Sequence, residues 1–278
     1  MRVGLCCMTL NNINSNFTYW IHHHLNIVKI DFILLRKEFM NEILDSNILN
    51  IPKVIIIESD VIKNHYDSYE VQQYRQIDFV NRCIQKYCPM YQIDYLLHLD
   101  DDELLVIHKK WSDIHHYLKN LHWENGKTHL TIQNVEAILK RNTDFTNDDN
   151  IFKKTKFFKN CSREKCRGYS NGKSLANLSF CKECNGCHTF KGDAIYSNIK
   201  DIMILHYDSI IFEHWEKKFK RLGTLSMECF KSIPFPFYKQ SIKIMYTNDA
   251  EKKKKFWSDK ISDCSHPMDI TKEYNILY

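Results

Sequence analysis

Glycine and proline are scarce in this sequence, with 7 Gly and 5 Pro among 278 residues. This scarcity excludes collagen-like repeats and the Pro/Gly-rich segments that usually join independent domains. The chain is 44% hydrophobic and 26% charged, which is enough to bury one substantial core and too apolar for a disordered protein. We therefore expect one catalytic-sized folded unit rather than several independent domains.

Long hydrophobic runs are also missing. The longest apolar candidates, 2–10 and 54–57, fall far short of the roughly 18 residues that cross a bilayer. The first ten residues lack a small-residue cleavage site, so they predict a buried strand rather than a signal peptide. We expect a cytoplasmic protein without a membrane span.

Charge of one sign is not in large excess. Lys and Arg number 39 against 34 Asp and Glu, a formal net charge of +5. Much of the excess lies in runs such as 252–255, which are typical of a solvated surface. Nucleic acid is therefore an unlikely partner.

Cysteines gather in one part of the chain. Five of the eleven lie between 161 and 187, which is more typical of reduced thiols with one metal cluster than of a secreted disulfide framework. The first candidate set for a structural Zn²⁺ is Cys161, Cys166, Cys181 and Cys184, with Cys187 as a further thiol. Unpaired thiols or oxidisable pairs are the alternative. Zinc here would also support a competing function, a zinc-knuckle nucleic-acid-binding protein or a metal-dependent nuclease.

Apolar segments alternate between strand-like and helix-like periodicity in the first hundred residues. Strands are predicted at 2–10, 31–36, 54–57 and 95–99, and helices at 17–30 and 69–87. This alternation favours a parallel sheet with crossover helices. After residue 105 we expect a short helix at 112–121, a strand pair or long strand at 129–139, a polar region over 142–190, a strand at 202–205 and a helix at 212–225.

An acidic run follows the strand at 95–99. Four acidic side chains, Asp100 to Glu103, stand where ligands gather in open α/β sheets. An extended turn sends Asp100 and Asp102 to one side, where they can hold Mn²⁺ or Mg²⁺ and leave positions open for phosphate oxygens. A capping box, with Asp100 as N-cap and Glu103 at the third position of a short helix, explains the same residues equally well.

Several motifs in order resemble the GT-A glycosyltransferases, close to the family-2-like and family-92-like enzymes. The central one is Leu99-Asp-Asp-Asp-Glu-Leu-Leu105, an apolar strand ending in Asp-x-Asp-Glu. The others are a Trp-x-x-x-His element, a Gln-x4-Asn helix, a Lys-Ser strand with a His turn, and a His-Tyr pair before a Lys-bearing helix, here 20–25, 76–81, 171–188 and 205–218. The chain departs from the family pattern at Leu10-Asn11-Asn12 and around Ala176-Asn177.

The resemblance implies a GT-A fold with a mainly parallel central sheet. The GT-A domain would span 1–244, with a Cys-rich insertion at about 157–190, and a helical tail would occupy 245–278. Asp102 and Asp100 would hold the metal with His206, for which His188 is the rival. Contacts with the nucleotide-sugar donor are expected from Asn11, Gln76, Asn81, Lys173 and Lys217.

The implied activity is metal-dependent transfer of a hexose from a nucleotide sugar, with a UDP-sugar favoured, to a glycan, protein or other hydroxyl acceptor. The metal would neutralise charge on the leaving diphosphate, with Asp100 and Asp102 at the reacting centre. An inverting reaction needs a carboxylate base beside the acceptor hydroxyl, for which Glu136 and Asp193 are the candidates. An inactive carbohydrate-binding relative is a third hypothesis.

Overall fold

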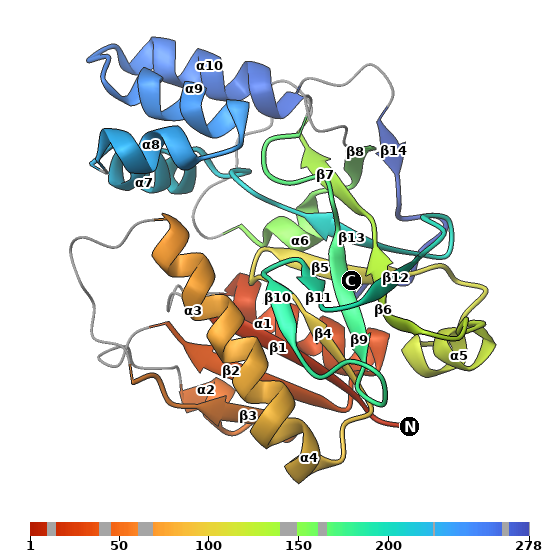
Figure 1. Cartoon of the computed structure of the whole chain (residues 1–278). Coiled ribbons are helices and arrows are strands. Elements are labelled where there is room, and N and C mark those ends of the chain that lie inside the picture. The colour runs from red at the N-terminus through yellow and green to blue at the C-terminus, as the bar shows by residue number, and fades with distance from the viewer. Residues whose placement is uncertain are drawn as a thin grey trace.

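We analysed a computed structural model of the chain (Figure 1). The structure describes residues 1–9, 15–38, 46–60, 69–139, 149–160, 166–224, 226–262 and 267–277. The predicted donor contact Asn11 and the predicted zinc ligand Cys161 lie outside these ranges.

A mainly parallel sheet of seven strands forms the centre of the molecule. Its order is β12-β6-β9-β4-β1-β2-β3. The strands are β12 (Asp193–Tyr196), β6 (Lys127–Ile132), β9 (Lys173–Asn177), β4 (Tyr95–His98), β1 (Val3–Thr9), β2 (Phe32–Lys37) and β3 (Val54–Ile57). β4, β1, β2 and β3 run parallel, which confirms the fold class expected from the alternating pattern. Every residue of β1 is buried, as expected for a parallel strand covered on both faces.

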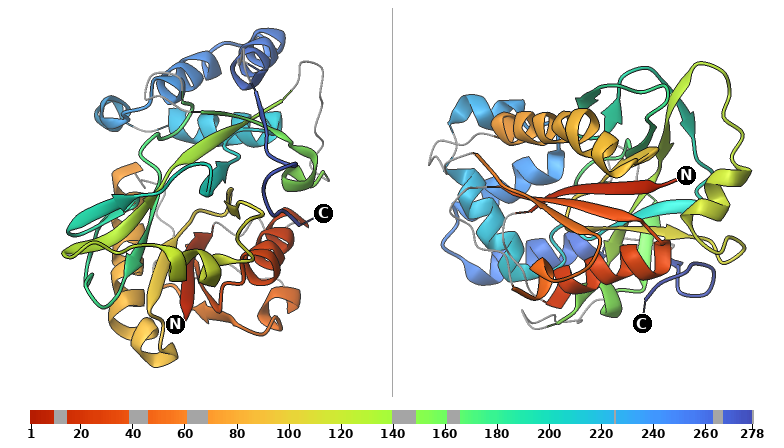
Figure 2. Two further views of the ribbon diagram at one scale, coloured as in Figure 1. Left: turned by 90° about the vertical axis from the view of Figure 1, so that its right-hand side faces the viewer. Right: turned by 90° about the horizontal axis from the view of Figure 1, so that it is seen from below.

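Helices cover both faces of this sheet. α1 (Ser15–His22) and α3 (Tyr69–Arg82) lie on opposite sides of the parallel strands (Figures 1 and 2). Both helices continue in a wider π-helical stretch, η1 (His23–Val28) and η2 (Cys83–Tyr87), so both predicted helices are confirmed at nearly their full length. The shorter helices are α2 (Ser46–Leu49), α4 (Cys88–Tyr91), α5 (Ile114–Asn120) and α6 (Ile151–Lys154).

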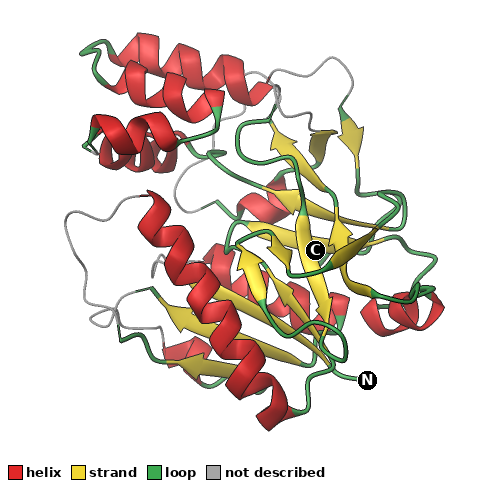
Figure 3. Ribbon diagram, viewed as in Figure 1, coloured by secondary structure: helices red, strands yellow, loops and turns green. Residues whose placement is uncertain are grey.

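A second sheet lies beside the first, in the order β14-β8-β7-β13-β5 (Figure 3). Its strands are β14 (Met268–Asp269), β8 (Phe157–Asn160), β7 (Asn134–Ile138), β13 (Ile202–His206) and β5 (Glu103–Ile107). The segment expected as a strand pair at 129–139 splits between the two sheets, as β6 and β7. The chain also passes from one sheet to the other between β4 and β5, and the acidic run forms that connection.

The Cys-rich segment is not an insertion as a whole. β9 lies between β4 and β6 in the interior of the large sheet, and β8 pairs with β7. Only the small hairpin of β10 (Cys184–Gly186) and β11 (Thr189–Phe190) stands apart as its own two-stranded sheet. The prediction of an insertion over 157–190 is corrected accordingly.

The C-terminal region is helical, as expected. It contains α7 (Phe212–Gly223), α8 (Met227–Ser232), α9 (Pro236–Met245) and α10 (Ala250–Ser262). The tail packs back on the rest of the molecule, since Trp257 is buried and its Nε1 donates a 2.8 Å hydrogen bond to the Ser209 carbonyl. None of the described helices combines the length and apolarity that a bilayer crossing requires.

Candidate active site

The acidic run forms a turn between the two sheets. The Asp100 backbone N–H donates a 2.8 Å hydrogen bond to Glu103 Oε2, which is the return bond of a capping box. No short helix follows, however, because Glu103 is the first residue of β5. The capping interaction is thus present, and the helix that it was expected to begin is not.

Helix α1 fixes the strand that leaves this turn. β5 is an edge strand, and the backbone groups on its open edge need partners. Trp20 Nε1 donates to the Glu103 carbonyl at 2.6 Å, His23 Nε2 donates to the Leu105 carbonyl at 2.8 Å, and His24 Nε2 accepts from the Leu105 N–H at 3.2 Å. The Trp-x-x-x-His element is therefore buried and supports the acidic turn from behind.

Strand register brings His206 to the same turn. In β13, His206 pairs with Glu103 of β5 on one side and with Glu136 of β7 on the other. Its Nε2 lies 3.9 Å from Asp102 Oδ2, and its Nδ1 lies 3.6 Å from Glu136 Oε1. Within the described residues, the only group of three potential ligand side chains close enough to hold a metal is Asp102, Glu103 and His206.

Carboxylates surround the imidazole of His206. Burial alone would lower its pKa, but the neighbouring carboxylates of Glu136, Asp102 and Glu103 outweigh burial and raise the pKa to about 9. Burial raises the pKa of Asp102 and raises that of Glu103 to about 7. The electrostatic field of this cluster favours a cation.

The cluster fits a divalent metal through two of its members. Two ligand atoms, each about 2.1 Å from one ion, lie roughly 3.0 to 4.2 Å apart, and the Asp102–His206 distance of 3.9 Å is in that range. Glu103 is fully buried, and its oxygens accept from the Asp100 N–H and the Tyr169 hydroxyl. Asp102 and His206 could thus hold Mn²⁺ or Mg²⁺ and leave its other positions to water or substrate oxygens.

Residues beneath His206 hold its ring in place. Glu136 is completely buried and accepts hydrogen bonds from Arg167 Nε at 3.1 Å and from the Gly168 N–H at 2.9 Å. Burial raises the pKa of the Glu136 carboxyl, but Arg167, His206 and the Gly168 N–H together outweigh burial and lower the pKa to about 2. Gly168 lies so close that a Cβ there would stand 2.8 Å from His206 Cε1. A carboxylate behind a metal-binding histidine commonly orients the ring.

Lys173 and Gln76 hold Asp100. The Lys173 ammonium is fully buried and lies 2.7 Å from Asp100 Oδ2, and Gln76 Nε2 donates to Asp100 Oδ1 at 2.9 Å. Both Asp100 oxygens are thus engaged, and Asp100 is not a member of the metal group. We correct two predictions on this basis: Lys173 supports the turn instead of facing a diphosphate, and Asp100 is a positioning residue for the turn.

A second buried carboxylate lies in the loop between β13 and α7. Asp208 accepts hydrogen bonds from Lys218 Nζ at 2.7 Å and from the Tyr238 hydroxyl at 3.1 Å. Burial raises the pKa of the Asp208 carboxyl, but the charges of Lys218, His206 and Arg167 together outweigh burial and hold this pKa well below its usual range. Sequence analysis missed Asp208, Lys218 and Tyr238, although the His-Tyr pair before a Lys-bearing helix pointed to this segment.

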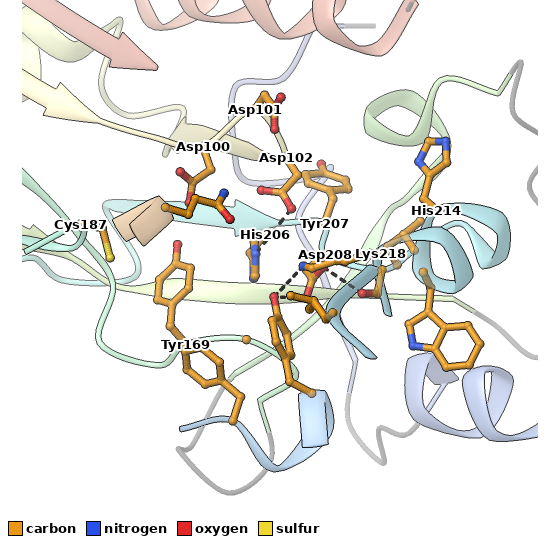
Figure 4. A pocket seen from close by; sticks show the side chains of 18 of the residues that line it. Asp100, Asp101, Asp102, Tyr169, Cys187, His206, Tyr207, Asp208, His214 and Lys218 are labelled. Atoms are coloured by element: carbon orange, nitrogen blue, oxygen red, sulfur yellow. Dashed lines mark hydrogen bonds and ion pairs between the residues drawn. The ribbon is translucent and has the colours of Figure 1, made fainter. Parts of the chain in front are cut away.

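The acidic turn, His206 and the Asp208–Lys218–Tyr238 network line one cavity of about 800 Å³ (Figure 4). The acidic turn and His206 form one wall, and α7 forms another with Lys217, Lys218 and Arg221. Of the predicted residues, Gln76, Asp100, Asp102, Cys187, His188, His206 and Lys217 line this cavity. Pockets of 300 to 1,000 Å³ are typical of sites for small ligands.

Four predicted residues, His188 among them, lie outside the cavity or have partners that do not match their predicted roles. His188 lines the cavity, but its Nδ1 lies 3.1 Å from the Gly172 carbonyl and it is not in the metal group. Asn81 holds the Cys184 backbone through hydrogen bonds of 2.7 and 3.1 Å. Asp193 is exposed on the edge strand β12, and Glu136 is buried beneath His206. Asn81, Asp193 and Glu136 do not line the cavity, so their predicted donor-binding and base roles are corrected.

The cysteines do not form the predicted zinc site within the described residues. Cys166 is disulfide-bonded, so its sulfur is not an available thiolate. Cys181, Cys184 and Cys187 are free thiols, and none of them belongs to a described group of metal-binding geometry. Sγ of Cys181 and of Cys184 instead lies near backbone carbonyls of the same hairpin segment. The zinc-knuckle hypothesis loses its structural basis in this part of the chain.

Comparison with known proteins identifies no family. No family model matches the chain, and no curated protein matches it. Solved structures that match include A197 from STIV, with 10% identity, a TM-score of 0.33 and coverage of 74% of this chain and 85% of A197. S. aureus TarS (residues 1–349, in complex with UDP-GlcNAc) has 7% identity, a TM-score of 0.33 and coverage of 94% and 82%. The mannosyltransferase PcManGT from Pyrobaculum calidifontis, in complex with GDP-Man and Mn²⁺, has 9% identity, a TM-score of 0.38 and coverage of 94% and 69%. TM-scores of this size identify no activity for this chain.

Proposed function

We propose that this protein is a metal-dependent glycosyltransferase that moves a hexose from a nucleotide sugar, with a UDP-sugar favoured, to a hydroxyl of a glycan, protein or other acceptor. One observation carries the proposal. Asp102 and His206, whose side-chain atoms lie 3.9 Å apart, stand at the junction of two sheets beside a cavity of about 800 Å³. Lys218 of α7 lines the same cavity, and its positive charge suits a ligand with a diphosphate.

The chemistry requires charge neutralisation on the leaving group. Transfer breaks the bond between the anomeric carbon and the diphosphate, and negative charge develops on the phosphate oxygens. Mn²⁺ or Mg²⁺ held by Asp102 and His206 would supply Lewis-acid stabilisation of that charge. Lys218, fixed by Asp208 and Tyr238, places a further positive charge on the same cavity.

We propose that transfer proceeds with inversion at the anomeric carbon, which needs a carboxylate base beside the acceptor hydroxyl. Asp208 lines the cavity, but Lys218, Ser209 and Tyr238 engage both of its oxygens and its pKa is held low, so we assign it the positioning of Lys218 and not proton transfer. The anomeric configuration of the product, read by NMR, tests inversion, and retention would overturn it.

The experiment for the activity itself is release of free nucleotide from UDP-, GDP-, CMP- and dTDP-sugars, with Mn²⁺ or with a chelator. We expect turnover of at least one donor with Mn²⁺ and none with the chelator. Asp102→Asn should abolish that turnover, whereas the matched control Asp193→Asn, an exposed carboxylate outside the cavity, should keep it. Turnover that is unaffected by chelator and by Asp102→Asn would contradict the proposal.

A further inference from the structure

The cations on α7 fall into two groups that differ in their partners. Away from the cavity, Lys220 is paired with Glu216 at 3.1 Å, and Lys253 of α10 approaches the same carboxylate at 3.7 Å. On the cavity side, Lys218 is the one α7 cation with an acidic partner among the described residues, Asp208. The side chains of Lys217 and Arg221 are exposed and line the cavity, and no described carboxylate lies within ion-pair distance of either.

Helix geometry places Lys217 and Arg221 together. Residues four apart on an α-helix have their side chains on one face, about 6 Å apart at the backbone, so an ammonium and a guanidinium can reach one anionic group. α7 rises about 1.5 Å per residue, which places Arg221 roughly 4.5 Å farther along the helix than Lys218. Lys217 comes one residue before Lys218, so the pair spans the helix on both sides of Lys218, and Arg221 lies farthest from the start of α7.

The same end of the cavity also has an apolar side. Leu222 of α7, Phe235 just before α9 and Tyr238 of α9 line the cavity near Arg221, and the hydroxyl of the mostly buried Tyr238 also bonds to Asp208 and Lys218. Aromatic rings commonly pack against the apolar face of a sugar, and a guanidinium binds a carboxylate or phosphate through two parallel hydrogen bonds. The two surfaces together fit a saccharide that carries a negative charge.

We infer that Lys217 and Arg221 bind the anionic group of an acidic saccharide acceptor, one that bears a carboxylate or a phosphate. This inference rests on the proposed transferase function, since it places the acceptor in the same cavity as the donor. It also reassigns Lys217, which the motif resemblance had placed on the donor diphosphate.

Equilibrium binding without donor tests the inference separately from catalysis. The probes are methyl glucuronide and glucose 6-phosphate, with methyl glucoside as the neutral control, titrated into the full chain by calorimetry. We expect the charged probes to bind at least about tenfold more tightly than the neutral one, with an advantage that falls as salt increases. The double variant Lys217→Gln/Arg221→Gln should lose that advantage, and the control Lys220→Gln should keep it.

Transfer kinetics then distinguish the acceptor from the donor. With the donor found by nucleotide release, the double variant should raise the KM for a charged acceptor about tenfold and leave the donor KM within about twofold. A rise in the donor KM with unchanged saccharide binding would overturn the inference and assign the pair to the diphosphate. Equal binding of charged and neutral probes to the wild type would also overturn it. Charged-probe binding without any nucleotide release would instead contradict the proposed function.

Discussion

Two segments of this chain have the residue types of a metal site, but only one of them lies in a described group of metal-binding geometry. The acidic run at 100–103 acquires a ligand partner, His206, from a strand about a hundred residues later. The cysteine segment at 161–187 offered five thiols, yet its described thiols form no metal-binding group and Cys166 is disulfide-bonded.

The difference lies in what surrounds each segment. Strand register aligns His206 with Glu103 and Glu136, and Arg167 and Gly168 fix Glu136 from below. The thiols of Cys181 and Cys184 instead lie near backbone carbonyls and are buried in an apolar cluster. Cysteines at suitable spacing in the sequence are therefore a weaker indication of a metal site than a carboxylate at the junction of two sheets whose neighbouring histidine is held by buried residues.

The largest effect should come from removing the imidazole. We expect His206→Ala to lower the rate of nucleotide release by roughly 1,000-fold, about 4 kcal/mol, because the metal loses one of its two protein ligands. Cys184→Ser is the matched change in the other segment and should alter the rate less than about twofold. Comparable losses of rate in both variants would mean that the cysteine segment matters for the activity as much as the acidic turn does.

Removing the charge beneath His206 should chiefly affect stability. Glu136→Gln leaves the Arg167 guanidinium buried without its carboxylate, so we expect the free energy of unfolding to fall by about 3 kcal/mol in urea denaturation. The control is Glu183→Gln, since the Glu183–Lys191 pair is exposed and should contribute less than about 1 kcal/mol. Equal losses of unfolding free energy in the two variants would show that the buried Glu136–Arg167 pair contributes no more to stability than an exposed pair.

A smaller effect should follow from crowding the histidine. In Gly168→Ala the new Cβ would stand 2.8 Å from His206 Cε1, so the ring must shift. We expect Mn²⁺ affinity to fall about tenfold while the chain stays folded. Gly186→Ala, where the nearest atom would be 3.5 Å away, is the control. If the Mn²⁺ affinity of Gly168→Ala is unchanged, metal binding does not depend on the orientation of the His206 ring.

The smallest effect concerns zinc. If the cysteine segment holds no structural metal, treating the purified protein with a chelator of zinc should shift its Tm by less than about 1 °C. Elemental analysis should likewise find well below one zinc per chain. One tightly held zinc, lost together with several degrees of Tm, would restore the predicted site.

Sequence patterns predicted the fold better than the site. The strands at 54–57 and 95–99 and the helices at 17–30 and 69–87 have strong periodicity, and the structure confirms them within a few residues. Periodicity gave no strand at β9, which only the Lys-Ser motif indicated, because Lys173 and Ser174 are polar although both are buried by partners from distant segments. Asp102 and His206 were predictable from motifs, whereas the Asp208–Lys218–Tyr238 network depends on how α7 and α9 pack, which no local pattern encodes.

The most direct test of the account is a Mn²⁺ titration followed by electron paramagnetic resonance, on the wild type, Asp102→Asn and a Cys181→Ser/Cys184→Ser variant. We predict one bound Mn²⁺ in the wild type and in the cysteine variant, and its loss in Asp102→Asn. Binding that survives Asp102→Asn, or that disappears with the two cysteines, would contradict the assignment of the metal to Asp102 and His206.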